Sequence, residues 1–191
     1  MILLNQRTLR KIQQYCEGNT IKFKKNYYGL NYCSDTAEFG HLSLLILLKL
    51  DNFTNKTIDR TARSGHLSTV KWLHYHGNEA STYAIDSAAM NGHLDVVKWL
   101  LLNRNEGMCI DALLYAISFG HLNTVKFLYD IFTDNKHKLH TKIADNLRKY
   151  YYEFAKSDSL LDHATEYYHK HIYDWLKEQQ LILKNKNYQF N

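Results

Sequence analysis

Apolar residues recur along this chain at helical spacing, in pairs of short segments separated by a turn. The apolar residues of segment 94–101 lie near i, i+3, i+6 and i+7: Leu94, Val97, Trp99, Leu100 and Leu101. Lys98 lies among them on the polar side. The preceding segment, 84–90, carries the small pair Ala88-Ala89, which allows a second helix to approach closely. The pattern therefore predicts two short helices that pack together.

This pair of segments recurs around a four-residue phrase. Its copies are Phe39-Gly40-His41-Leu42, Ser64-Gly65-His66-Leu67, Asn91-Gly92-His93-Leu94 and Phe119-Gly120-His121-Leu122. The glycines at 40, 65, 92 and 120 are spaced by 25, 27 and 28 residues. Periods of this length are typical of solenoids, because one pair of short helices does not bury its own apolar face. We therefore predict an all-α solenoid of helix-turn-helix repeats.

Each residue of the phrase has an expected role in the turn. Glycine ends the first helix in the left-handed conformation, which has little steric cost only for glycine. We expect the histidine to form a hydrogen bond across the turn and the leucine to open the second helix toward the core. Three residues before each glycine stand apolar side chains that we assign to packing: Ala37, Ala62, Ala89 and Ile117.

The segment that repeats most clearly carries a family resemblance. Its residues, Asp86-Ser87-Ala88-Ala89-Met90-Asn91-Gly92-His93-Leu94-Asp95-Val96-Val97-Lys98-Trp99-Leu100, resemble the helix-turn-helix core of an ankyrin repeat. Over 31–130, four copies keep this register. The repeats are shorter than the usual 33 residues and lack the Thr-Pro-Leu-His start. The resemblance therefore implies a short-repeat variant with reduced β-hairpin fingers, which binds proteins through a concave helix face and inter-repeat loops.

The two ends of the chain depart from the repeat. Residues 162–176 align without gaps on 86–100, with Tyr168 in place of the glycine, as expected of a degenerate C-terminal capping repeat. We predict an N-terminal capping helix at 5–17. We expect a capping helix and connector at 1–30, four ankyrin-like repeats at 31–130, irregular helices with the capping repeat at 131–183, and a polar tail at 184–191.

Composition narrows the class of protein. Of 191 residues, 45% are hydrophobic and 23% are charged, with a formal net charge of +5, which is typical of ordered globular chains. The chain has three cysteines, an odd number, and they are widely spaced: Cys16, Cys33 and Cys109. This favours free thiols in a reducing compartment over a secreted protein held together by disulfides. The longest apolar run, 44–48, is far shorter than the ~20 residues of a membrane span. We expect a soluble, intracellular protein in the cytoplasm or nucleus.

Candidate chemistry is sparse. Histidine occupies the repeat turn in every copy, and a residue that recurs once per structural unit indicates a structural role. Only His137 and His140 have an i, i+3 spacing suited to a metal, and no carboxylate or cysteine completes a set. The glycines are a whole repeat apart and form no phosphate-binding loop. We therefore expect no enzyme activity, no metal and no cofactor.

Aromatic and basic residues raise two further questions. Trp72, Trp99, Phe127 and Trp175 share one register position, where packing is favoured over a binding platform. The basic stretches 22–25 and 136–142 would suit nucleic acid, but nearby acidic residues dilute them. The alternative function, a nucleic-acid-associated accessory protein, predicts a steep loss of binding with salt.

The connectors between repeats hold the candidate binding residues. These vary between copies at equivalent exposed places: His76, Asn78, Glu79, Tyr83, Asn103, Arg104, Glu106 and Asp111. Such variation is typical of a protein-binding surface and also of ordinary surface loops, so both interpretations stay open. We predict a monomeric, non-enzymatic protein–protein interaction module, a scaffold or adaptor, whose partner is an unidentified protein.

Overall fold

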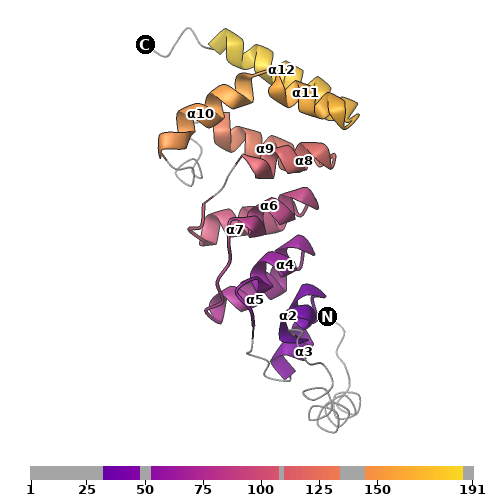
Figure 1. Cartoon of the computed structure of the whole chain (residues 1–191), viewed down its shortest axis with the longest axis vertical. Helices are drawn as coiled ribbons and strands as arrows, with labels where there is room; N and C mark the ends of the chain where they lie inside the picture. Colours follow the sequence, from indigo (N-terminus) through magenta and orange to yellow (C-terminus); the bar gives the residue numbers. More distant parts are fainter. Residues whose placement is uncertain (1–31, 48–52, 108–109, 134–144, 187–191) are drawn as a thin grey trace.

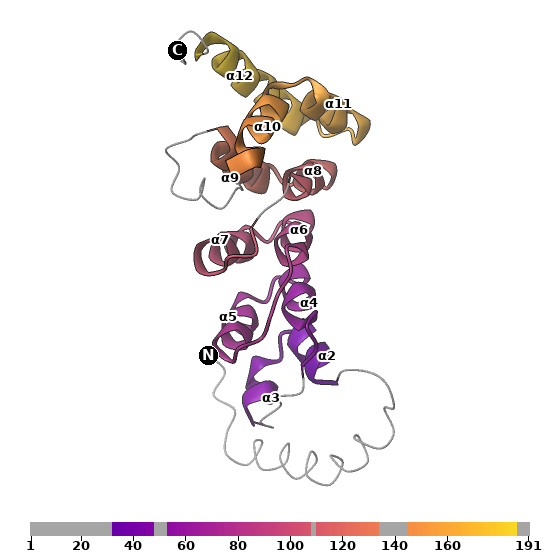
Figure 2. The same cartoon turned by 60° about the vertical axis from the view of Figure 1, so that its left-hand side comes forward.

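The chain stacks its helices in two columns. In the computed structural model, the described residues are 32–47, 53–107, 110–133 and 145–186, and all their regular elements are helices. The first helices of the repeats are α2 (Tyr32–Glu38), α4 (Thr57–Arg63), α6 (Tyr83–Met90) and α8 (Asp111–Ser118). The second helices are α3 (Leu42–Leu47), α5 (Leu67–Tyr75), α7 (Leu94–Asn103) and α9 (Leu122–Thr133). Figures 1 and 2 show the two columns, which confirm the predicted all-α repeat fold.

Small side chains allow the first helices to pack directly on one another. Helix α6 contacts both α4 and α8. Ala88 and Ala89 are fully buried, as is Ala116 in the next repeat. On α7, Val97 and Leu100 are buried while Lys98 is exposed. The apolar stripe that predicted this helix therefore forms its contact with the core, and its burial is the main source of stability for so short a helix.

The turn between first and second helices needs glycine for its backbone. Gly92 has a φ of 73°, in the left-handed region, and its N–H donates to the carbonyl of Ala89. The N–H of His93 donates to the carbonyl of Ala88 over 2.9 Å. These two bonds satisfy carbonyl groups at the C-terminus of α6, which otherwise lack partners within the helix.

The backbone N–H of the turn histidine makes the expected hydrogen bond across the turn, and its ring has a further role that we did not predict. The ring lies against the glycine of the preceding repeat. The His121 ring packs on Gly92, and its Nε2 donates to the carbonyl of Met90 over 3.0 Å. His169 does the same at Gly120, donating to the carbonyl of Ser118 over 2.9 Å. The turn histidine therefore joins consecutive repeats.

The aromatic register position packs between second helices. Trp99 is only 9% exposed. The Lys98 ammonium lies 5.1 Å from the centre of the Phe127 ring in the next repeat, and Lys126 lies 5.7 Å from that of Trp175. Such cation–π contacts each contribute about 0.5–1 kcal/mol at exposed sites. The aromatic residues are thus part of the stack, and the lysines cover them.

The helix-turn-helix arrangement returns at the C-terminal end. After α10 (Asp145–Lys156), α11 (Ser159–Glu166) packs on α8, and α12 (Lys170–Lys186) packs on α9 and α11. Tyr168 occupies the glycine position with a φ of 59°, and its side chain is 93% exposed. Helix α12 continues to Lys186. Residues 184–186, which we predicted to belong to the polar tail, are therefore helical.

Several sequence predictions lie outside the described residues. They are the N-terminal region 1–30 with its capping helix, the basic stretches 22–25 and 136–142, the histidine pair His137/His140, the thiols of Cys16 and Cys109, and most of the tail at 184–191. The division into four domains therefore stays a prediction.

Candidate protein-binding surface

The eight candidate residues fall on two consecutive connectors and the helices that follow them. His76, Asn78, Glu79 and Tyr83 lie between α5 and the start of α6. The second group, Asn103, Arg104, Glu106 and Asp111, lies between the end of α7 and the start of α8. Because α5 contacts α7 and α6 contacts α8, the two connectors are neighbours at one edge of the stack.

Arg104 joins these connectors from a half-buried position. Its Nε and Nη2 donate to Glu106 Oε1 over 2.8 and 2.5 Å. Its Nη1 donates to His74 Nδ1 over 2.8 Å and to the carbonyl of Asn78 over 3.3 Å. The Arg104 side chain is 12% exposed. This cluster, the Arg104 bridge, fixes one connector against the connector of the preceding repeat.

Three other candidates complete the ends of second helices. His76 Nδ1 donates to the carbonyl of Trp72, and the two rings stack with their centres 3.9 Å apart. Asn78 Nδ2 donates to the carbonyl of Leu73 over 3.0 Å. Asn103 Nδ2 donates to the carbonyl of Trp99 over 2.8 Å. These polar groups bind carbonyls in the last turns of the second helices, and His76 and Asn103 remain exposed to solvent.

The remaining candidates face outward. Glu79 and Asp111 are exposed, and Tyr83 is 48% exposed at the start of α6. A tyrosine supplies a large, rigid contact area, and this residue type is enriched among the residues that dominate binding energy. Tyr83 is the only large aromatic side chain with this exposure among the eight candidates.

Our repeat pattern missed two polar contacts that position the connectors. The Asp59 carboxylate, 5% exposed, accepts from the N–H of Ser81 over 2.9 Å and from its hydroxyl over 2.6 Å. One repeat earlier, Ser34 Oγ accepts from the N–H of Thr54 over 3.2 Å. Ser34 and Asp59 hold matching positions 25 residues apart, the spacing of Gly40 and Gly65. A polar residue at this position is the signal that could have identified both contacts.

The solvent-exposed side of the first helices forms a second surface beside the connectors. The repeats of α4, α6, α8 and α11 each contribute two positions seven residues apart, which lie on one side of a helix. We call this surface the first-helix face; its residues are Lys56, Arg63, Tyr83, Met90, Asp111, Ser118, Ser159 and Glu166. Met90 and Ser118 are half-buried, and the other six are exposed.

One cluster near this face resembles a nucleophile–base–acid arrangement. Ser118 Oγ lies 2.7 Å from His163 Nε2, and His163 Nδ1 lies 4.0 Å from Glu166 Oε2. The Ser118 hydroxyl also donates to the carbonyl of Leu114 over 2.9 Å, and the Glu166 side chain is 70% exposed. The serine–histidine contact joins α8 to α11, so we assign the cluster to stacking.

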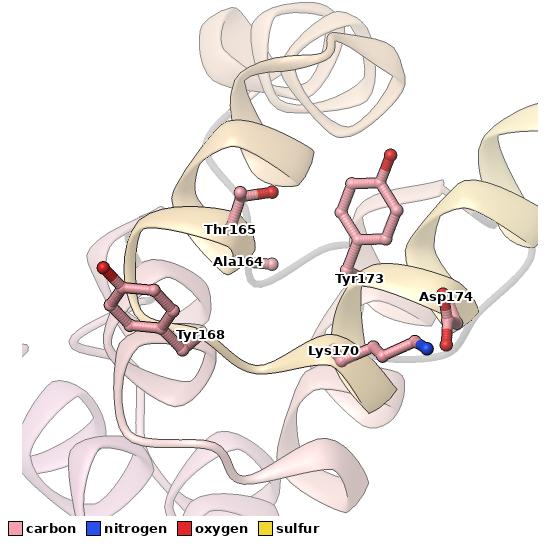
Figure 3. A pocket seen from close by; sticks show the side chains of 6 residues that line it. All are labelled: Ala164, Thr165, Tyr168, Lys170, Tyr173 and Asp174. Carbon is pink, nitrogen blue, oxygen red and sulfur yellow. The ribbon is translucent and has the colours of Figure 1, made fainter.

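The C-terminal end of the stack carries an open hollow of about 390 Å³. Figure 3 shows its lining: Ala164, Thr165, Tyr168, Lys170, Tyr173 and Asp174. Ala164 matches Ala88 and Ala116, which face the neighbouring repeats in the interior of the stack. The hollow lies between the end of α11 and the start of α12, around the turn that holds Tyr168.

The acid response of the Arg104 bridge gives a first prediction. Burial raises the pKa of Glu106, but hydrogen bonds from Arg104 and from the backbone N–H groups of Asn105 and Glu106 outweigh it and hold the pKa below its ordinary value. Such a carboxylate stabilises the fold above its unfolded-state pKa, and the contribution is lost as the pH falls through the folded-state value. We expect the free energy of unfolding of the native chain to fall more steeply below about pH 4 than that of Glu106→Gln. Urea unfolding at several pH values, followed by circular dichroism, measures both. Equal slopes would contradict the assignment.

The geometry defines a helix-turn-helix repeat solenoid with an ordered connector edge. Residues 58–139 match the family model of ankyrin repeats (3 copies), and this part of the chain belongs to the ankyrin repeat family. Among curated proteins, none matches the sequence. Ankyrin repeats generally mediate protein–protein interactions, and domains built from them are typically non-enzymatic.

The described residues lack the features of two other classes of protein, membrane-spanning proteins with apolar helices and metal-binding proteins. Within 32–47, 53–107, 110–133 and 145–186, no helix is both long and apolar enough to cross a membrane. The same residues contain no group of three or more histidine, cysteine, aspartate or glutamate side chains placed to hold a metal ion.

Proposed function

We propose that this chain is a non-enzymatic scaffold or adaptor that holds a protein partner against its connector edge and first-helix face. The observation that carries the proposal is the exposed Tyr83 beside connectors that the Arg104 bridge holds in place. An exposed aromatic side chain on an ordered support loses little conformational entropy on binding. An intracellular setting, cytoplasmic or nuclear, is part of the proposal.

We expect Tyr83→Ala combined with Glu79→Ala to lower partner retention at least tenfold, because truncating a tyrosine at the centre of an interface commonly costs more than about 1.4 kcal/mol. The measurement is affinity capture from a lysate of the encoding organism with quantitative mass spectrometry. Tyr150→Ala is the matched control, since Tyr150 on α10 is 55% exposed.

Three results would count against the proposal. Equal retention by the native chain and the Tyr83/Glu79 variant would exclude this surface. Equal losses in the Tyr150 control would indicate a nonspecific effect. Retained nucleic acid with a steep salt dependence would favour the nucleic-acid accessory function instead.

A further inference from the structure

Charge changes in a regular order along the first-helix face. Lys56, directly before α4, and Arg63, the last residue of α4, are exposed cations. On α6, the matching positions are Tyr83 and Met90. Beyond α6, the exposed charged residues of the face are Asp111 on α8 and Glu166 on α11. The face therefore runs from basic through apolar to acidic in the direction from α4 to α11.

Neighbouring side chains sharpen both ends of this gradient. Arg60 also lies on α4, but it is paired with Asp35, 2.6 Å away, and with Glu38, both on α2. The exposed charge at α4 thus comes from Lys56 and Arg63. On α11, Asp162 is exposed four residues before Glu166, on the same side of the helix.

The spacing of the helices suits one conformation of a bound segment. Packed helices lie roughly 8–10 Å apart. A polyproline II segment has three residues per turn and a rise of about 3.1 Å, so its same-side residues recur about every 9 Å. Every third residue of such a segment would meet successive first helices. Positions 1, 4, 7 and 10 of the segment would then lie over α4, α6, α8 and α11, so about ten residues span the face.

We propose that the first-helix face binds an extended, polyproline II-like segment of a partner protein with an acidic residue at position 1, an apolar residue at position 4 and a basic residue at position 10, read from α4 to α11. The inference rests on the proposed function, because it names the partner chemistry for the same surface. The charges would set the orientation of the segment, and Tyr83 with Met90 would receive its apolar side chain.

The test is selection of phage-displayed random dodecapeptides on the immobilised full chain, read by sequencing. The selection is repeated on Lys56→Glu/Arg63→Glu and on Tyr83→Ala. Lys149→Glu/Lys170→Glu is the control: it makes the same change in net charge at two exposed lysines of α10 and α12. Far-UV circular dichroism checks that each variant is folded.

We expect peptides with the acidic, apolar and basic order, in either chain direction, to be enriched at least tenfold on the native chain and on the control, and to be lost on both face variants. Two results would overturn the inference and leave the proposed function standing. In the first, the enriched peptides are lost on Tyr83→Ala but show no charge order. In the second, they are lost on Tyr83→Ala but are still enriched on Lys56→Glu/Arg63→Glu. Peptides insensitive to every variant, or no enrichment on the native chain, overturn both.

Discussion

Replacing Gly92 with alanine is expected to destabilise the stack by about 3 kcal/mol. Gly92 has a φ of +73°, so any side chain is strained there. An added Cβ would also lie 2.5 Å from the His121 ring, which itself donates to the carbonyl of Met90. The ring would have to move, and α8 would lose its register on α6.

Gly77→Ala is the matched control for backbone strain alone. Gly77 has a φ of +76°, but an added Cβ there would meet nothing within 4 Å. We expect this variant to cost about 1 kcal/mol. Urea unfolding followed by circular dichroism gives both values, and native-state hydrogen exchange in α8 reports the local effect. Adding His121→Ala to Gly92→Ala should remove the steric part of the loss. Equal losses in the two glycine variants would refute the contact.

The same contact explains why tyrosine is tolerated at position 168. Gly40, Gly65, Gly92 and Gly120 each have the histidine ring of the following repeat against them. Tyr168 has the left-handed backbone of the glycines, with a φ of 59°, but its side chain is 93% exposed. Only the backbone strain remains there, and such strain costs about 1–2 kcal/mol.

The periodic features of the fold could be predicted from the sequence because they follow from local spacing. The glycine–histidine phrase located each turn, and the stripe of Val97 and Leu100 located the inward side of α7. The hydrogen bond of each histidine across its own turn was also predicted, and its backbone N–H makes it, but the contact of the ring with the preceding repeat was not predicted. The partner of the ring, the carbonyl of Met90 for His121, is a backbone atom of the preceding repeat, and no sequence pattern marks a carbonyl.

The sequence located the candidate residues on the connectors, but it did not predict the contacts that each of them makes. Variation between connectors identified the region that holds Tyr83, Asn78 and Arg104. It did not separate outward side chains from inward ones. Arg104 reaches His74, thirty residues earlier, and the two meet only because α5 and α7 stack. Long-range pairing of this kind depends on the tertiary fold, so composition and periodicity do not contain it.

Replacing Arg104 with alanine is expected to lower the free energy of unfolding by about 2–3 kcal/mol. The change would leave the Glu106 carboxylate without its main partner, and it would free His74 Nδ1 and the carbonyl of Asn78. Removing one member of a half-buried ionic cluster costs more than the pair itself contributes, because the remaining charge stays desolvated. Arg104→Lys should recover only part of the loss, since an ammonium group does not reproduce the guanidinium fork.

A double-mutant cycle with Glu106→Gln measures how much of that loss passes through Glu106. We expect the two substitutions together to cost less than the sum of their separate effects, with a coupling of about 1 kcal/mol or more. Binding to a partner should fall in parallel with stability for Arg104→Ala, whereas Tyr83→Ala should weaken binding at unchanged stability. If Arg104→Ala instead weakened binding with no change in urea stability, Arg104 would be a direct contact and the bridge would not be what orders the connectors.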